Sequence, residues 1–280
     1  MPQIAIMGVG MVGGALLRYF VQQKQIQPIL YDPFKNLTDT NALNQAEVIF
    51  LCVPTPYDEA MGGFDLSYLD KAFDVLTGGK IVVIKSTVLP GTTNEYQKKY
   101  PQHKILFNPE FLTEATADYD TLYPTRQLVG YTEKSQDEAE KIMELLPSAP
   151  YKKILPAKEV ETVKYFGNTL YALKVAFANQ IYDLCQKLGI DYETVKECAK
   201  AEPMVGKTHL EIFHTVGQRV KSYRGYGGKC LPKDTRALIQ LGKRAGIDLG
   251  VLEAAEKYNN ELIKKQGVEN QEKTDLEKDR

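Results

Sequence analysis

The sequence predicts an α/β protein in which a parallel sheet covered by helices is followed by an all-α domain that a long helix introduces. A chain of 280 residues has room for two domains, each with its own core. Short runs of β-favouring residues alternate with helical stretches up to residue 157, and from about Lys158 apolar residues recur three or four apart. We therefore expect a sheet domain at 1–157, a helical domain at 158–266 and a charged tail at 267–280.

Six runs in the first domain have the composition of strands. Two segments, Val48–Val53 and Ile81–Ile84, are almost continuous in apolar residues, which is typical of strands buried on both faces of a sheet. We place these two at the centre of the sheet. The complete expected set is Ile4–Met7, Pro28–Tyr31, Val48–Val53, Ile81–Lys85, Ile105–Phe107 and Gln127–Gly130.

The second domain opens with one long predicted helix, Lys158–Leu188. Its apolar residues form a single stripe, and Gly189 offers a stop. At 1.5 Å per residue a helix of roughly 30 residues is about 45 Å long. That exceeds what a small domain requires, so the helix is expected to connect two lobes or to form a dimer face. Further helices are expected at Tyr192–Ala199, Lys233–Ala245 and Leu249–Lys265, with a loop-rich segment at Tyr223–Cys230.

Charge and composition exclude several kinds of partner. Lys and Arg total 35 against 36 Asp and Glu, so no net field attracts nucleic acid or an anionic membrane surface. The sequence has no run of 18 apolar residues that could span a bilayer. A strand at the very start leaves no room for a targeting peptide, so we expect a cytoplasmic location. Charged residues dominate the last twelve positions, which are expected to be disordered.

Cysteine and histidine spacing argues against disulfides and metal sites. The four cysteines form no CxxC pair, and the three histidines lack zinc-binding spacing. Because Cys52, Cys185 and Cys198 lie in apolar strand or helix settings, they are interpreted as small buried hydrophobes. The histidines, His103, His209 and His214, are interpreted as structural.

A glycine motif follows the first predicted strand and opens a helix. Gly8 permits a tight turn, Gly10 lets a diphosphate approach the backbone, and Gly13 lets the helix pack closely on the strand. Asp32 ends the second strand, where a carboxylate can accept hydrogen bonds from the adenosine ribose, so the motif favours NAD over NADP. The alternative for Asp32 is a turn residue before Pro33. This combination predicts a Rossmann-type dinucleotide site.

A second motif carries the chemistry, in the segment Tyr226-Gly-Gly-Lys-Cys230-Leu-Pro-Lys233-Asp234. The segment resembles the GGxCxPKD catalytic loop of the UDP-glucose and GDP-mannose 6-dehydrogenases. The resemblance runs from residue 1 to about residue 266. Four further stretches agree in order: Val53-Pro-Thr-Pro56, Lys85-Ser-Thr-Val88 with Pro90-Gly-Thr92, Asn108-Pro-Glu-Phe-Leu112 with Glu114, and Lys164-Tyr-Phe-Gly-Asn168.

The resemblance implies an NAD-dependent four-electron oxidation of the C6 alcohol of a nucleotide sugar, with UDP-glucose to UDP-glucuronate favoured. Cys230 would trap the aldehyde as a thiohemiacetal, and oxidation would give a thioester that water cleaves. A thiol suits this role because its adduct can be oxidised and the sulfur can still leave. The alternative for Cys230 is a small buried hydrophobe.

Five further residues receive catalytic roles from the resemblance. Lys164 and Asn168 stand four apart on the long helix and would stabilise an oxyanion, the alternative being a solvated helix face. Glu110 would be the base for thioester hydrolysis, Thr87 would position a water or the substrate hydroxyl, and Asp234 would act beside Cys230. The alternative for Glu110, Thr87 and Asp234 is a capping or turn residue.

The resemblance also implies binding residues. Cofactor contacts are expected from Gly8, Gly10, Met11, Val12, Gly13, Asp32, Val53, Pro54, Thr55, Thr87 and Glu114. Substrate contacts are expected from Glu110, Phe111, Leu112, Glu114, Lys164, Asn168, Tyr223, Arg224, Gly227 and Lys233. For Glu114 the alternative is a turn residue, and for Lys233 it is a surface ion pair.

The sequence departs from the family in three places. Family members continue into a second Rossmann-like domain that binds the substrate nucleotide, whereas here only the charged tail follows residue 266, so we expect the nucleotide to lack that surface. Ala115 replaces the glycine that usually follows Glu114. Lys229 directly precedes the nucleophile and is expected to favour the thiolate of Cys230.

Three interpretations remain open at this point. The first is an active nucleotide-sugar dehydrogenase, a homodimer through the long helix, as the resemblance implies. The second is a non-catalytic NAD-binding partner of a full-length relative. The third is a dehydrogenase of the 6-phosphogluconate or 3-hydroxyacid type, against which the Cys230 loop argues because those enzymes do not need a cysteine.

Overall fold

A computed structural model describes residues 2–216, 219–228 and 230–268, and the chain divides into two compact units, Met1–Lys164 and Tyr165–Arg280. The expectations for Lys229 and for the tail from residue 269 onward fall outside the described residues. Helix α7 (Ala157–Leu188) runs without a break through the boundary between the units. The predicted domain boundary after residue 157 therefore stays a prediction.

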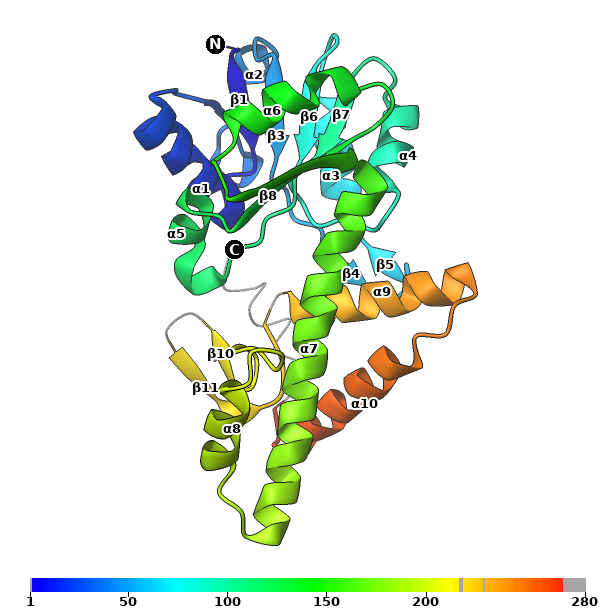
Figure 1. Cartoon of the computed structure of the whole chain (residues 1–280). Helices are drawn as coiled ribbons and strands as arrows, with labels where there is room; N and C mark the ends of the chain where they lie inside the picture. The colour runs from blue at the N-terminus through cyan, green and yellow to red at the C-terminus, as the bar shows by residue number, and fades with distance from the viewer. Residues whose placement is uncertain (1, 217–218, 229, 269–280) are drawn as a thin grey trace. The chain divides into compact units, whose positions relative to one another are not determined.

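The first unit is built on one large sheet, whose described strands follow the order β2-β1-β3-β6-β7-β8-β9 (Figure 1). It also contains a small antiparallel hairpin that the sequence did not predict, formed by β4 (Tyr57–Asp58) and β5 (Gly63–Phe64). The first five strands in that order are parallel, each paired in register with its neighbours. This confirms the predicted fold class. The strands are β1 (Ile4–Met7), β2 (Ile29–Tyr31), β3 (Val48–Leu51), β6 (Ile81–Ile84), β7 (Lys104–Phe107), β8 (Arg126–Tyr131) and β9 (Tyr151–Pro156).

Two features of the sheet differ from the sequence expectation. Strand β8 pairs antiparallel with β7, and β9, which was not predicted, pairs parallel with β8. Four of the six residues of β9 are exposed, including Tyr151 and both lysines that follow it, so the strand has no continuous apolar signature. The mixed edge leaves the arrangement of the five parallel strands unchanged.

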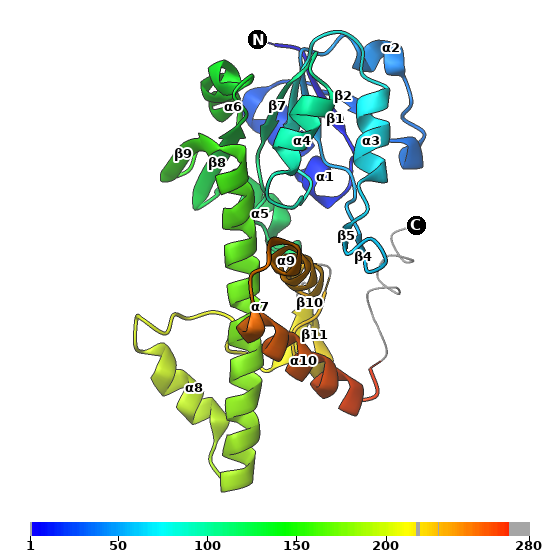
Figure 2. The same ribbon diagram turned by 90° about the vertical axis from the view of Figure 1, so that its right-hand side faces the viewer.

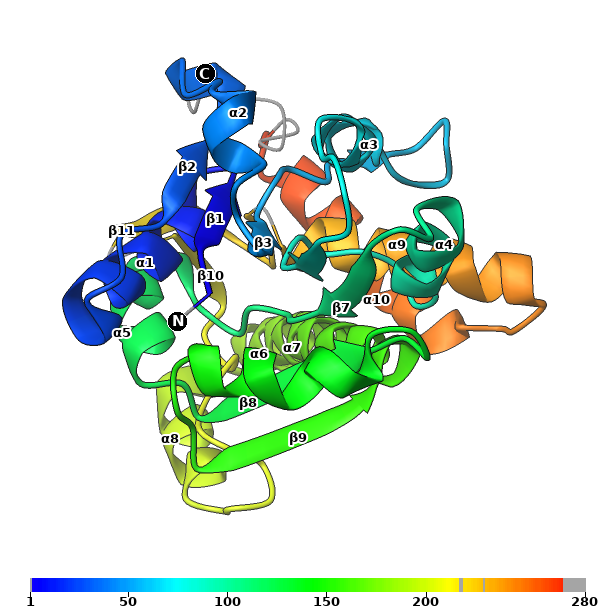
Figure 3. The same ribbon diagram turned by 90° about the horizontal axis from the view of Figure 1, so that it is seen from above.

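Each face of the sheet has its own apolar core because side chains alternate along the strands. Along β1, Ala5 and Met7 join the core beneath α2, α3, α4 and the start of α7, whereas Ile4 and Ile6 join the core beneath α1 and α6. Helices α3 and α4 lie together on the first face (Figure 2), and α6 lies on the opposite face (Figure 3). The helices are α1 (Met11–Tyr19), α2 (Thr40–Leu43), α3 (Ser67–Asp74), α4 (Thr92–Lys99), α5 (Ala117–Leu122) and α6 (Ala139–Leu145).

The glycines after β1 are required by close backbone contacts. Gly8 has a φ of 85°, in the left-handed region that side chains disfavour. A Cβ on Gly13 would lie 1.9 Å from the carbonyl oxygen of Gly8, whereas a Cβ on Gly10 would meet no atom within 4 Å. The fold therefore needs glycine at 8 and 13, and the space beside Gly10 is left open.

Helix α7 is fastened to the first unit by a buried carboxylate. Glu161 is fully buried, and its carboxylate accepts hydrogen bonds from the amides of Gly91 (2.5 Å) and Thr93 (2.9 Å) and from the Thr93 hydroxyl (2.6 Å). Burial raises the pKa of Glu161, and these donors oppose that rise. Glu161 thereby caps the amino end of α4 from another helix.

In the described part of the second unit the rest of α7 is followed by three more helices, as predicted, together with a hairpin that the sequence did not predict (Figure 1). Buried Ala172, Val175 and Ala176 of α7 pack with Tyr226, and residues of α10 complete this cluster. The elements are α8 (Tyr192–Lys200), β10 (Phe213–Val216), β11 (Arg219–Arg224), α9 (Leu231–Ala245) and α10 (Gly250–Lys265). The expected all-α domain therefore includes a small antiparallel sheet.

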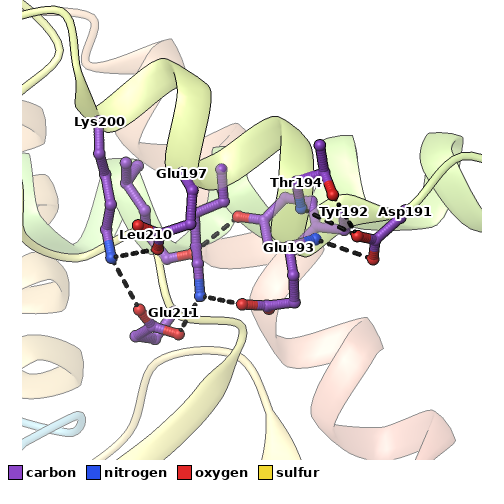
Figure 4. A network of polar contacts seen from close by, with 9 residues as sticks. Asp191, Tyr192, Glu193, Thr194, Glu197, Lys200, Leu210 and Glu211 are labelled. Carbon is purple, nitrogen blue, oxygen red and sulfur yellow. Dashed lines mark hydrogen bonds and ion pairs between the residues drawn. The ribbon is translucent and has the colours of Figure 1, made fainter.

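A charged cluster holds α8 against the segment that leads to the hairpin (Figure 4). The Glu211 carboxylate accepts hydrogen bonds from Lys196 (2.7 Å) and Lys200 (3.3 Å). Lys196 is buried and also contacts Glu193 at 2.6 Å, so its charge is compensated twice. Asp191 caps the helix by accepting from the amides of Glu193 and Thr194. These contacts explain why a short helix with few buried residues stays in place.

Cysteine exposure corrects one expectation and supports two. Cys185 is buried and Cys52 partly buried, but Cys198 on α8 is exposed, so its interpretation as a buried hydrophobe is wrong. Burial raises the pKa of the Cys52 thiol to about 12, which keeps that sulfur protonated and unreactive. Among the described helices, none combines the length and apolarity needed to cross a membrane.

We predict that Gly13→Ala destabilises the first unit, because a methyl group would overlap the Gly8 carbonyl. The expected loss in unfolding free energy is about 3 kcal/mol, measured by thermal or urea unfolding. The matched control is Gly10→Ala, whose methyl group meets open space. Equal stability of the two variants would contradict the account of this turn.

Candidate functional site

Most of the site residues predicted in the first unit follow the carboxyl ends of the five parallel strands. The strand order in the sheet places β1 between β2 and β3, so the connections on either side of β1 depart in opposite directions. Ligands of open α/β sheets bind at such a switch point. The loops that gather there begin at Gly8 after β1, Asp32 after β2, Cys52 after β3, Lys85 after β6 and Asn108 after β7.

The glycine loop after β1 is held by residues that follow β2. Asp32 is buried, and its carboxylate accepts hydrogen bonds from the amides of Val9 (2.7 Å) and Phe34 (3.1 Å). Lys35 donates from its amino group to the Val9 carbonyl at 2.6 Å. The main-chain amide and carbonyl of Val9 are therefore both held by hydrogen bonds. Each carboxylate oxygen of Asp32 still has a lone pair with which it can accept from a ribose hydroxyl.

These residues fit a dinucleotide. The open space at Gly10 lies at the amino end of α1, where unpaired amides favour a diphosphate. Met11 is exposed and Val12 partly exposed in the first turn, so both can meet a ligand there. Lys35 was not predicted to belong to the site. The only sign of its role in the sequence is its position three residues after Asp32.

The loops after β3 and β6 are tied to each other. The Thr55 hydroxyl donates to the Thr87 carbonyl at 2.7 Å, and the Ser86 hydroxyl donates to the Val53 carbonyl at 2.6 Å. Three predicted cofactor residues, Val53, Thr55 and Thr87, are thus brought together with Pro54 between them. Ser86 links the loops but was not predicted.

Glu110 and Lys164 form a buried ion pair, although 54 residues separate them in the sequence. The Lys164 amino group donates to Glu110 twice, to the carboxylate at 2.7 Å and to the main-chain carbonyl at 2.7 Å. The side chain of Lys164 is only 5% exposed and that of Glu110 only 12%, so few water molecules can compete for this contact. A proton acceptor and a cation are therefore fixed side by side.

A third charged residue, Lys85, reaches the same loop from β6. Its amino group donates to Asn108 at 2.5 Å for the side-chain oxygen and 3.4 Å for the main-chain oxygen. The Asn108 amide donates in turn to Gln127 and to the Leu128 carbonyl, both at 2.8 Å. Burial lowers the pKa of Lys85, and the neighbouring Glu110 opposes this. Sequence reasoning assigned no role to Lys85, because nothing local marks a buried lysine.

A cavity of about 90 Å³ lies beside this cluster. Glu110, Phe111 and Leu112, all predicted to contact substrate, line it together with Lys85. The guanidinium of Arg126, also in the lining, stacks 3.8 Å from the centre of the Phe111 ring. The first unit therefore offers a small partly polar cavity next to the Glu110–Lys164 pair.

In the second unit, Cys230 opens α9 and lies within one turn of two predicted charged residues. The Asp234 amide donates to the Cys230 carbonyl at 3.0 Å, and the Asp234 side chain is fully buried. Its carboxylate accepts from Asn168 at 2.6 Å and from Lys233 at 2.6 Å. The buried Asp234 of this turn therefore joins Asn168, which like Asp234 is predicted to be catalytic, and Lys233, which is predicted to contact substrate.

The glycine-rich loop before Cys230 is shaped by α10. Asn259 accepts from the Tyr226 amide at 2.8 Å and donates to the Tyr226 carbonyl at 3.0 Å. The Tyr226 hydroxyl donates to Glu256 at 2.5 Å, and Glu256 also binds Arg236 of α9. Gly225 and Gly228 have φ values of 110° and 75°, which few other residues adopt. Gly227 lies between them and is partly exposed.

Two predicted substrate residues are already engaged within the second unit. Arg224 donates to the side chain and carbonyl of Asn179 and pairs with Asp183 at 2.6 Å. Tyr223 is buried and packs against His214, with ring centres 5.2 Å apart. Arg224 therefore ties β11 to α7, and it would have to leave these partners to meet a substrate.

The last predicted site residue is Glu114. Glu114 begins a short 3-10 turn, Glu114–Thr116, and its side chain lies outside the described part. Within the described residues no group of three His, Cys, Asp or Glu side chains is arranged to hold a metal ion.

Comparison with protein-family models assigns both units to one family. Residues 27–147 match the NAD binding domain of the UDP-glucose/GDP-mannose dehydrogenase family, and residues 158–261 match its central domain. The first match confirms NAD as the cofactor expected from the glycine loop and Asp32.

Known proteins agree with this assignment. The chain is 32% identical over 254 residues to the UDP-glucose 6-dehydrogenase of Rickettsia bellii, covering 87% of this chain and 55% of that protein. The chain thus spans about half the length of the curated relatives it matches. A UDP-glucose dehydrogenase structure from Pyrobaculum islandicum superposes with a TM-score of 0.74 at 26% identity, covering 93% of this chain and 68% of that one.

A more distant structure shares only the fold. A 3-hydroxyisobutyrate dehydrogenase from Mycobacterium tuberculosis gives a TM-score of 0.70 at 15% identity, with 94% of each chain covered. The family matches and the relatives together show that this chain belongs to the UDP-glucose/GDP-mannose dehydrogenase family and contains its NAD-binding and central domains.

Proposed function

We propose that the protein oxidises the primary alcohol of a nucleotide sugar to a carboxylate through covalent adducts on Cys230. The observation that carries the proposal is the first turn of α9, where Cys230 precedes a buried Asp234 that is bonded to Asn168 and Lys233. Cys230 thus opens the helix whose first turn carries the cation Lys233 and the ordered acid Asp234. The names of the relatives support a nucleotide-sugar substrate.

The residues divide into binding and reacting groups. Gly8, Gly10, Gly13 and Asp32 would hold NAD, which when bound accepts the electrons of both oxidations. Lys164 and Asn168 would stabilise negative charge on the substrate oxygen, and Asp234 would orient Asn168. Thr87 would position a water or the substrate hydroxyl.

Cys230 would act as the nucleophile and Glu110 as the base for the last step. The sulfur adds to the aldehyde carbon, and oxidation of that adduct leaves a thioester. Water then forms a new C–O bond while the C–S bond breaks, the sulfur leaves as thiolate, and Glu110 takes a proton from the water. The product is a sugar carboxylate.

Among nucleotide sugars we propose UDP-glucose as the substrate, because the curated relatives are named for it. Glu110, Lys164 and Asn168 are proposed to contact the substrate as well as to act in the chemistry. The remaining proposed substrate contacts are Phe111, Leu112, Glu114, Tyr223, Arg224, Gly227 and Lys233. In this proposal the reaction takes place in the cytoplasm.

Two other functions remain as competitors. A non-catalytic NAD-binding partner of a longer relative would keep the glycine loop and Asp32, but it would have no need for Cys230 and Asp234. A 3-hydroxyacid-type dehydrogenase has the fold, as the Mycobacterium structure shows, but only at 15% identity. That chemistry needs no cysteine, so the first turn of α9 again favours the proposed oxidation.

We also propose a homodimer formed through α7. An apolar stripe along this helix is exposed in the single chain, which would favour a second copy covering it. The exposed residues are Phe166, Leu170, Phe177, Leu184 and Leu188.

Sedimentation velocity tests this dimer: the wild type is expected at twice the monomer mass, and Phe177→Glu, which puts a charge into the stripe, at the monomer mass. Val251→Glu, at an even more exposed apolar position on α10, serves as the control and should leave the dimer intact. A wild-type monomer at tens of micromolar would refute the dimer.

Turnover tests the main proposal. The purified protein is incubated with NAD and, separately, with UDP-glucose, GDP-mannose and UDP-N-acetylmannosamine, and NADH absorbance is followed. We expect two NADH per sugar with one of them. Cys230→Ser should lower the rate on the order of 10³-fold or more, because the serine adduct cannot form the thioester.

Cys198→Ser is the matched control, since that cysteine is exposed on α8. It should keep the wild-type rate. Measurable NAD affinity without NADH formation from any of the three sugars would reject the enzyme and favour the non-catalytic partner. Near-normal turnover in Cys230→Ser would reject the covalent route alone.

A further inference from the structure

The loop that carries Glu110 is held by two lysines from different elements. Lys164 of α7 binds Glu110 directly, through its carboxylate and its carbonyl. Lys85, at the end of β6, binds Asn108, two residues before Glu110. Both lysines are at most 8% exposed, so neither is a surface residue that happens to point inward.

The two lysines have different roles in the proposed reaction. If Lys164 stabilises a substrate oxyanion, its ammonium group has to share its three N–H donors between Glu110 and the substrate during the reaction. Lys164 then holds the loop less firmly just before Glu110 is needed as a base. Lys85 has no part in the proposed chemistry, so nothing in the proposed steps requires it to give up its hydrogen bonds to Asn108.

The contact between Lys85 and Asn108 is rigid because both the oxygen and the amide group of the Asn108 side chain have hydrogen-bond partners. Its side-chain oxygen accepts from Lys85, and its amide donates to Gln127 and Leu128 of β8. Gln127 donates onward to the Pro147 carbonyl at 3.2 Å. Asn108 is completely buried, so water cannot replace a lost partner. Lys85 and Glu110 also line the same cavity.

We propose that Lys85 is a positioning residue that holds the Asn108-Pro109-Glu110 turn so that Glu110 stays aligned for thioester hydrolysis when Lys164 shares its donors with the substrate. This inference rests on the proposed function and names a residue that acts through Glu110 rather than on the substrate. It assigns Lys85 to the last step only. Attack by Cys230 and the two oxidations do not depend on it.

The test separates the last step from the earlier ones. Lys85→Met removes the donors and keeps an unbranched chain. In rapid-mixing experiments with excess NAD and UDP-glucose, the first turnover should release NADH at close to the wild-type rate. Hydrolysis should then slow by about 10- to 100-fold, as expected for a displaced catalytic group. Intact-protein mass spectrometry should show the acyl adduct on Cys230 accumulating.

Three variants control the experiment. Lys80→Met removes a lysine at the other end of the same strand, where it donates to the Asn44 carbonyl at 2.6 Å, and should show no adduct. Lys85→Arg retains donors and should restore hydrolysis at least in part. If Lys85→Met does not fold, Lys85→Gln, which keeps a polar head group, provides the same comparison.

Two results would overturn the assignment. Hydrolysis in the Lys85 variants as fast as in Lys80→Met would show that Lys85 does not position Glu110. Equal slowing of the first NADH release and of hydrolysis would show a general structural role. A wild type that forms no NADH would instead refute the proposed function, and the role of Lys85 would fall with it.

Discussion

The buried ion pair between Glu110 and Lys164 is the contact on which the candidate site of the first unit depends. A carboxylate and an ammonium taken out of water each carry a desolvation cost, and only their mutual attraction and hydrogen bonds offset it. Here the lysine also binds the Glu110 carbonyl, so the pair fixes the backbone as well as the charge. One contact therefore sets the position of a loop and the start of a long helix.

The beginning of α7 is held in place by contacts with two other segments, the amino end of α4 and the loop after β7. Glu161 caps α4, and Lys164, three residues later, binds the loop after β7. Residues three apart lie on the same side of a helix, so both contacts secure one face of α7. In the second unit the same helix presents Asn168 to Asp234. The sequence spacing of Lys164 and Asn168 thus serves two separate polar contacts.

Local patterns were enough to predict most of the elements. The buried strands β3 and β6, the glycine turn and α7 each have a periodicity that a short window of sequence reveals. Strand β9 and the β4–β5 and β10–β11 hairpins were missed. The exposed lysines of β9 hide any apolar alternation, so its pairing with β8 is a tertiary effect. Cys198 was misread for the same reason, since its neighbours do not reveal which side of α8 faces the solvent.

The site residues could be named from motifs, but their pairing could not. Glu110 meets Lys164 across 54 positions, and Asn168 meets Asp234 across 66, so no spacing rule applies. Lys85 was beyond reach altogether, because its partner Asn108 is buried only through contacts with β8. A lysine at a strand end is ordinarily exposed, and only the folded structure shows that this one is not.

A double-mutant cycle on Glu110 and Lys164 tests the central claim most directly. Urea unfolding would be measured for the wild type, Glu110→Gln, Lys164→Met and the double variant. If the two side chains are coupled, each single substitution should lower the free energy of unfolding by about 3–5 kcal/mol, because it leaves a buried polar group without its partner. Coupling also predicts that the double variant loses less than the sum by about 1–3 kcal/mol. Small, additive losses would show that the two side chains are neighbours without being coupled.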